Sequence, residues 1–113
     1  VDFHAQATSE KAAFAWYLDG RVSAVVGTHT HAPTADGRVM PAGTAFISDV
    51  GMVGPINSVI GSDPADVLER FLSQMPNRLR IPKGTVQFNS VLIDINDIDG
   101  KATKIERIDM EVG

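Results

Sequence analysis

The stretch VSAVVGTHTH, residues 22–31, decides how the fold is read. Residues 22–26 form a short apolar run, which predicts a buried β-strand. Gly27 follows and favours a sharp backbone turn where that strand ends. His29 and His31, two of the three histidines of the chain, come directly afterwards. Strand ends are where α/β sheets build their sites, so this stretch predicts both a central strand and a functional site.

Strand and helix patterns alternate on both sides of this stretch. Strands are predicted at residues 1–4, 43–50, 85–96 and 103–112, and helices from Thr8 or Ser9 to residue 18 and over residues 64–75. Residues 33–41 and 51–61 are rich in glycine and proline and are predicted to be loops. Asp99 and Gly100 predict a hairpin between the last two strands. The order favours an α/β fold whose sheet is covered on both faces.

Two helical faces are expected to be buried. In the first helix, Ala13, Trp16 and Tyr17 fall at helical spacing, and Thr8 or Ser9 is the candidate N-cap. The second helix begins at Asp63 and Pro64. Its apolar face is expected to comprise Val67, Leu68, Phe71, Leu72 and Met75, and Pro76 is expected to end it.

Composition narrows the function classes. The 113 residues, 43% of them hydrophobic, suit one globular domain. A net charge of −4 argues against a DNA-binding surface. No apolar run approaches the ~20 residues of a membrane span, so we expect a cytoplasmic protein with no membrane contact. The chain has no cysteine, so any metal would have to be held by nitrogen and oxygen ligands.

The spacing of the histidines predicts a metal site. Side chains alternate along an extended chain, so His29 and His31 are expected to point to one side and Thr30 into the fold. His4 also stands at the end of a predicted strand. If the two strands are neighbours, all three imidazoles meet at one edge, and imidazole is the commonest protein ligand of metals. Three histidines and a water suffice for one zinc ion but are too few for a two-metal centre.

Asp2, Thr28 and Asp49 are the candidate residues for contact with the histidine ligands or with a substrate. Asp2 lies two residues before His4 and could act as a ligand or accept a hydrogen bond from its imidazole. Asp49 lies at a predicted strand end, before Gly51. Asp36, beside Gly37, is interpreted as a turn residue.

Several motifs of the chain resemble a known family. The segments VDFHAQATSEKAAFAWYLDGRVSAVVGTHTH, TAD, GTAFISDVGMVGP, SVIG, RFLSQMPNRLRI and GKATKIERI are similar to the second half of bacterial YmdB-type metallophosphoesterases of the calcineurin-like superfamily. The resemblance covers essentially the whole chain. It implies a fold of two β-sheets flanked by helices and a phosphodiesterase acting on cyclic nucleotides.

The resemblance also implies a dinuclear metal centre. His4 matches the isolated histidine ligand of the family, and His29 and His31 match its Gly-x-His-x-His motif. In family members the equivalents of His4 and His29 hold one metal and that of His31 the other, the ions being iron, manganese or zinc-like. The remaining ligands and the proton-donating histidine of the family lie upstream, so no catalytic residue is assigned in this chain. Gln6 stands where many relatives have a glutamate.

Residues 1–113 are therefore expected to be a single domain, the C-terminal part of a metallophosphoesterase domain whose N-terminal half is absent, and to be weak or inactive alone. The expected partners are a phosphodiester or cyclic-nucleotide substrate, the N-terminal half or a complementary chain, and further copies in a homo-oligomer. Two alternatives stay open: a mononuclear zinc-binding module held by all three histidines, and a non-enzymatic interaction fragment.

Overall fold

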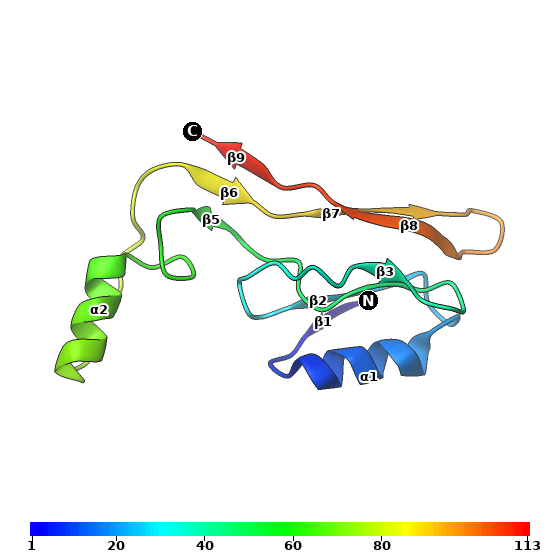
Figure 1. Ribbon diagram of the computed structural model, residues 1–113, viewed down its shortest axis with the longest axis horizontal. Helices are drawn as coiled ribbons and strands as arrows, with labels where there is room; N and C mark the ends of the chain where they lie inside the picture. Colours follow the sequence, from blue (N-terminus) through cyan, green and yellow to red (C-terminus); the bar gives the residue numbers. More distant parts are fainter.

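Nine strands and two helices follow one another along the computed structural model, which describes residues 1–113. They are β1 (Asp2–His4), α1 (Thr8–Leu18), β2 (Ala24–Thr28), β3 (Arg38–Val39), β4 (Ala45–Ile47), β5 (Val53–Pro55), α2 (Pro64–Ser73), β6 (Val86–Phe88), β7 (Val91–Ile95), β8 (Ala102–Arg107) and β9 (Met110–Val112) (Figure 1). The predicted order is confirmed. β3 and β5 lie in the predicted loops, and each of the two last predicted strands is broken into two.

A four-stranded sheet forms the centre, in the order β1-β2-β4-β3. β1, β2 and β4 run parallel, and β3 is antiparallel to β4. In register, His4 lies opposite Thr28 at the ends of β1 and β2. The prediction that Gly27 turns the chain is wrong, because β2 continues through it to Thr28. The parallel register brings the residues after both strands to one end of the sheet.

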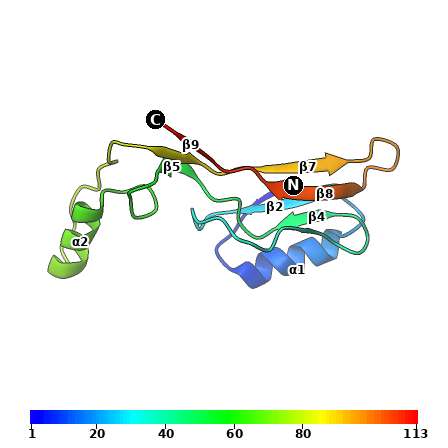
Figure 2. The same cartoon turned by 45° about the horizontal axis from the view of Figure 1, so that its top comes forward.

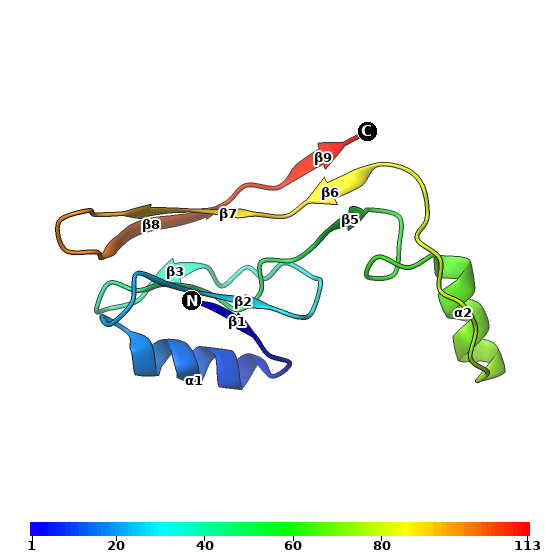
Figure 3. The same cartoon turned by 180° about the vertical axis from the view of Figure 1, so that it is seen from behind.

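Layers on the two faces of this sheet make the fold α/β, as predicted. α1 covers one face, and the antiparallel hairpin β7–β8 lies over the other (Figure 2). The amide of Ala102 donates to the carbonyl of Gly43 at 2.8 Å, and Nη2 of Arg107 donates to the carbonyl of Val50 at 2.8 Å. At the end of this block nearer α2, β5, β6 and β9 form a separate antiparallel sheet that leads to α2 (Figure 3).

The core lies between α1 and the sheet. Its buried centre comprises Ala15, Val25, Met40 and Phe46. The predicted buried face of α1 is wrong, because Ala13, Trp16 and Tyr17 are exposed. The helix instead presents Lys11 and Ala15, one turn apart, and the small Ala15 lets its backbone approach the sheet.

Each of the two exposed aromatic rings of α1 is in contact with one arginine. Arg38 lies 5.8 Å from the Trp16 ring centroid, and Arg21 lies 5.1 Å from that of Tyr17, both as cation–π contacts. The N-cap prediction is also wrong, because Ala7 occupies that position without a side-chain hydrogen bond.

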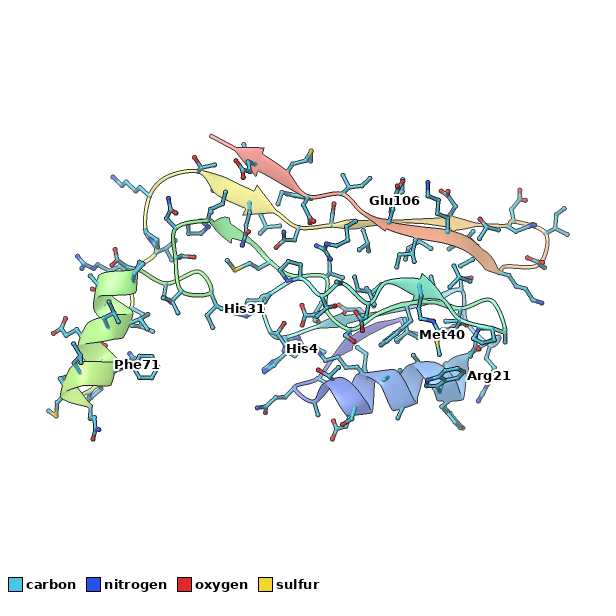
Figure 4. The ribbon with its side chains drawn as sticks, in the orientation of Figure 1. His4, Arg21, His31, Met40, Phe71 and Glu106 are labelled. Atoms are coloured by element: carbon cyan, nitrogen blue, oxygen red, sulfur yellow. The ribbon has the colours of Figure 1, made fainter.

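The second helix begins as predicted but covers nothing in this chain. The Asp63 side chain accepts from the Ala65 amide at 2.8 Å, with Pro64 at the first helical position. α2 ends at Ser73, and Gln74 adopts the left-handed conformation, so Pro76 is not the residue that ends it. Most of the predicted apolar face is exposed, including Phe71 at 74% (Figure 4) and Leu68, Leu72 and Met75.

Coverage of the hairpin is likewise one-sided. Leu92 and Ile95 of β7 are exposed, so the prediction of a sheet covered on both faces fails for this hairpin.

Neither helix has the length or the apolar character that crossing a membrane requires.

A carboxylate on α2 ties the helix to the segment that follows it. Asp66 accepts from Nε and Nη2 of Arg80 at 2.9 and 2.7 Å, and from the Arg80 amide at 3.0 Å. These bonds from Arg80 hold the pKa of Asp66 down from 3.8 to about 2.

We expect this tie to weaken in acid. Because the folded pKa of Asp66 lies below its ordinary value, its contribution to stability is complete above that value and is lost as the pH falls toward 2. Thermal unfolding of the protein and of Asp66→Asn, compared from pH 5 to pH 2, measures this contribution. The difference in melting temperature between them should shrink as the pH falls. A difference that is constant over this range would contradict the assignment.

Candidate metal centre

Two of the three histidines meet at the carboxyl ends of β1 and β2. Nε2 of His4 lies 3.2 Å from Nδ1 of His29. Their ring centroids are 5.0 Å apart, and the ring planes are inclined at 79°. Both side chains are exposed, so the pair faces solvent. The prediction that His4 and His29 converge is confirmed by this geometry.

A series of hydrogen bonds through Thr28 and Asp2 sets the tautomer of His4. The Thr28 hydroxyl donates to Oδ1 of Asp2 at 3.1 Å, which uses its single proton. The same hydroxyl lies 3.0 Å from Nδ1 of His4, so Nδ1 must be the donor in that bond. Nε2 of His4 therefore keeps its lone pair and accepts the hydrogen bond from Nδ1 of His29. Asp2 and Thr28 thus hold the imidazole in the way that outer-shell partners hold metal ligands.

The separation of the two nitrogens fits a shared cation. Two nitrogens bound at the Zn–N distance, with tetrahedral or octahedral angles, lie about 2.9–3.4 Å apart. The observed 3.2 Å between His4 and His29 falls within that range. Neutral imidazole nitrogens suit iron and zinc ions, among others.

His31 lies apart from this pair. Its Nδ1 donates to the carbonyl of Ile60 at 3.2 Å, so its Nε2 also keeps a lone pair. His4 and His31 both lie at the end of the sheet that faces α2 (Figure 4). No group of three or more histidine or acidic side chains converges on one point in the structure. The three imidazoles are therefore arranged as a pair and a single ring, and the expectation of one common meeting point is wrong.

The local backbone explains why His29 and His31 diverge. β2 ends at Thr28, and His29 and His31 have φ angles of 136° and 64°. Alternation of side chains holds only in an extended chain, so the predicted common direction does not apply here. Thr30 is exposed and its hydroxyl donates to the carbonyl of Ala32 at 3.0 Å, so the prediction that it points inward is wrong as well.

Asp49 lies beneath the histidines and has no access to a substrate. Its side chain is fully buried, and Oδ2 accepts from the Thr30 amide at 2.8 Å while Oδ1 accepts from the Gly51 amide at 2.9 Å. Burial raises its pKa, but these amide bonds and Lys11 outweigh burial and bring the pKa below 3.8. Asp49 therefore bonds the backbone of its surroundings, and the prediction that it could contact a substrate is wrong.

Asp36 lies in the loop before β3, and its carboxylate bonds a distant segment, which its interpretation as a turn residue did not predict. Its Oδ1 accepts from the Thr34 hydroxyl at 2.7 Å and from the Ser48 amide at 3.1 Å, and its Oδ2 accepts from the Ser48 hydroxyl. These bonds join the loop after the histidines to the end of β4.

Lys11 is the residue of this region that the sequence analysis missed. Its side chain is 1% exposed, and Nζ lies 3.3 Å from Oδ2 of Asp49. One signal was available, since Lys11 is the only charged residue in the run KAAFAWYL of α1. A lysine one helical turn before the buried Ala15 must share its buried face.

Comparison with known proteins places this geometry in a family. The profile of the YmdB-like protein family matches residues 1–108. The chain belongs to the YmdB-like family. A Bacillus subtilis relative named 2',3'-cyclic-nucleotide 2'-phosphodiesterase is 54% identical over 108 residues. That match covers 96% of this chain and 41% of the relative, so the chain spans about two fifths of the relative's length.

Solved structures of YmdB-like relatives have the same fold. A Mycoplasma pneumoniae structure described as a novel phosphatase superposes with a TM-score of 0.92 at 42% identity, covering 98% of this chain and 40% of that one. A Thermus thermophilus structure, described as a hypothetical protein, gives 0.91 at 43% identity, covering 98% and 43%. The architecture of this YmdB-like chain is thus that of part of a phosphatase fold.

Proposed function

We propose that this chain supplies the histidine ligands of a two-cation centre that hydrolyses phosphodiesters, with cyclic nucleotides as the substrate class. His4 and His29 hold one divalent cation and His31 holds the other, the ions being iron, manganese or zinc-like. Residues 1–113 form the C-terminal part of the metallophosphoesterase domain. The other ligands and the proton-donating group come from protein outside these residues.

The observation that carries this proposal is the pairing of the two strand-end histidines. Nε2 of His4 and Nδ1 of His29 are separated by 3.2 Å, and the proton of His4 is committed to Thr28 on the far side of its ring. His31 supports a second position, because its own proton is committed to Ile60 and its other nitrogen is free. The different hydrogen-bond partners of the pair and of His31 support two ions rather than one.

In the proposed reaction, each residue of the candidate site has a defined task. Cations bound in a two-metal centre polarise the phosphorus–oxygen bonds and lower the pKa of bound water. His4, His29 and His31 position these charges and transfer no proton, because a nitrogen that ligates a cation has no free lone pair. Asp2 and Thr28 orient His4, and the buried Asp49 orients the loop that carries the other two histidines.

The substrate class rests on the relatives. The Bacillus subtilis relative is named for cyclic-nucleotide phosphodiester hydrolysis, and its 54% identity covers 96% of this chain. The family model matches residues 1–108, a range that contains all three histidines. The Mycoplasma pneumoniae structure is described as a phosphatase. Both names concern attack at phosphorus, which is the chemistry that two adjacent cations favour.

Metal counting together with turnover tests the proposal. The complete protein, which contains residues 1–113 together with the other ligands, is loaded with Mn²⁺. It should contain two cations per molecule and hydrolyse bis(4-nitrophenyl) phosphate and 2',3'-cyclic AMP. Elemental analysis, intact mass and light scattering on the same sample give the metal count and the number of chains. One tightly bound ion would favour the mononuclear zinc module, and neither metal nor turnover would favour the interaction fragment. Either result would overturn the two-cation proposal.

A further inference from the structure

A buried ion pair lies directly beneath the histidine loop. Lys11 and Asp49 are 1% and 0% exposed, and Nζ of Lys11 lies 3.3 Å from Oδ2 of Asp49. Removing two charges from water is costly, and a buried pair is weak evidence of a gain in stability. Its contacts with neighbouring backbone groups indicate a role other than stability.

The contacts of this pair lie on both sides of His29. Asp49 accepts the Thr30 amide at 2.8 Å, immediately after His29. Nζ of Lys11 donates to the carbonyl of Thr28 at 3.4 Å, immediately before it. Asp49 also accepts the Gly51 amide at 2.9 Å, which connects the loop to the end of β4. The pair thus joins α1, the histidine loop and the end of β4 through backbone groups.

The loop held in this way has an unfavourable backbone conformation. His29 and His31 have φ angles of 136° and 64°, a region that residues with a Cβ rarely occupy. Such conformations persist only where the surrounding structure imposes them, and they cluster at functional sites. Around His29, the Asp49 carboxylate accepts from the Thr30 amide, and the Thr28 carbonyl accepts from the Lys11 ammonium and from the Ala5 amide.

We propose that the Lys11–Asp49 pair is a positioning device that sets the directions of the His29 and His31 imidazoles before any cation binds. Lys11 and Asp49 are positioning residues, since both are buried and neither contacts an imidazole. The proposal rests on the proposed function, because cation binding is what the preset loop serves.

A neutral double variant separates this role from simple packing. In Lys11→Met/Asp49→Asn no buried charge is left unpaired, so the protein should still fold, with a melting temperature lowered only by the loss of one amide bond. Asparagine has one acceptor oxygen where aspartate has two, so either Thr30 or Gly51 loses its acceptor. We expect Mn²⁺ affinity, measured by calorimetry on the intact protein, to fall about 10–100-fold, as for lost outer-shell partners of metal ligands.

The matched control is a second ion pair that bonds a backbone group, between Asp66 of α2 and Arg80. Arg80→Met/Asp66→Asn also replaces a pair whose oxygens accept a backbone amide, but far from the histidines along the chain. It should lower the melting temperature while Mn²⁺ affinity stays within about twofold, because neither Asp66 nor Arg80 bonds the loop that carries His29 and His31. Equal losses of affinity in both double variants would overturn the positioning role.

A metal-free measurement separates this inference from the proposed function. Hydrogen exchange of the Thr30 and Gly51 amides in the metal-free protein should accelerate at least about tenfold for one of the two in Lys11→Met/Asp49→Asn, since asparagine keeps an acceptor for only one of them. If the unmodified protein binds no Mn²⁺, the proposed function fails, and exchange of these two amides still decides on the ion pair. If the protein binds Mn²⁺ and the double variant binds it equally well, the positioning role alone fails. Should the double variant not fold, Lys11→Arg decides, because it keeps the buried positive charge but changes its geometry toward the Thr28 carbonyl and Asp49; unchanged affinity with unchanged exchange of both amides would overturn the role.

Discussion

Replacing His29 with alanine is expected to remove one of two cations and to lower phosphodiester turnover by at least about 100-fold, because even an outer-shell partner of a metal ligand is worth about 10–100-fold. His29 is exposed, and its Nδ1 contacts only Nε2 of His4. The melting temperature of the metal-free protein should therefore change little. Elemental analysis and turnover of bis(4-nitrophenyl) phosphate on the intact variant measure both effects.

Two comparison variants make this result specific. His31→Ala should lose the other cation, since its ring is bonded to Ile60 and not to the His4–His29 pair. Thr8→Ala should keep both cations and full turnover, because Thr8 is exposed at the start of α1 and makes no side-chain hydrogen bond to the site. A His29→Ala protein that retains two cations and normal turnover would contradict the shared site of His4 and His29.

Gly27→Ala is expected to be the most disruptive small substitution in the chain. A Cβ at Gly27 would lie 1.8 Å from the carbonyl oxygen of Ser48 and 2.8 Å from Cδ of Lys11. The first contact is with backbone, so β2 and the end of β4 must move apart. Overpacking of a core costs typically 1–3 kcal/mol, and we expect a loss of about 3 kcal/mol or more because a strand must shift. Chemical denaturation measures the loss.

The same shift should also disturb the site. The end of β4 carries Asp49, whose carboxylate holds the Thr30 amide, so Mn²⁺ affinity should fall together with stability. Gly37→Ala is the control, since its Cβ would meet Ile47 at 3.6 Å and Ile105 at 4.0 Å, which are ordinary contacts. Its stability should stay within about 1 kcal/mol of the unmodified protein, because only chain entropy changes. Similar losses in the two glycine variants would refute the steric explanation.

Local chemistry accounts for the features that could be predicted from the sequence. The apolar run before the histidines predicted a central strand, and Asp63 with Pro64 predicted the start of α2. Both signals act within a few residues, as strand and helix-capping preferences do. His4 and His29 were predicted to meet because each follows a strand end. Parallel neighbouring strands bring such ends to one edge, and the β1–β2 register does so.

Other features failed because they depend on which neighbours a residue acquires. Trp16 and Tyr17 have the spacing of a buried face, yet Ala15 permits the closer helix–sheet approach and the rings remain outside. The apolar face of α2 has the pattern of a core helix, but no segment of residues 1–113 covers it. A hydrophobic pattern predicts that a face can be buried and does not identify what buries it.

By itself, the sequence of this protein determined its kinds of elements, their order and the histidines that stand at strand ends, because these follow from contacts within a turn or a strand. Only the tertiary structure decided that His31 turns away from the His4–His29 pair and that Asp49 and Lys11 support the loop from below. These outcomes depend on backbone angles at His29 and His31 that are imposed by residues far along the chain on either side. Such angles are unfavourable locally, so no local preference could have predicted them.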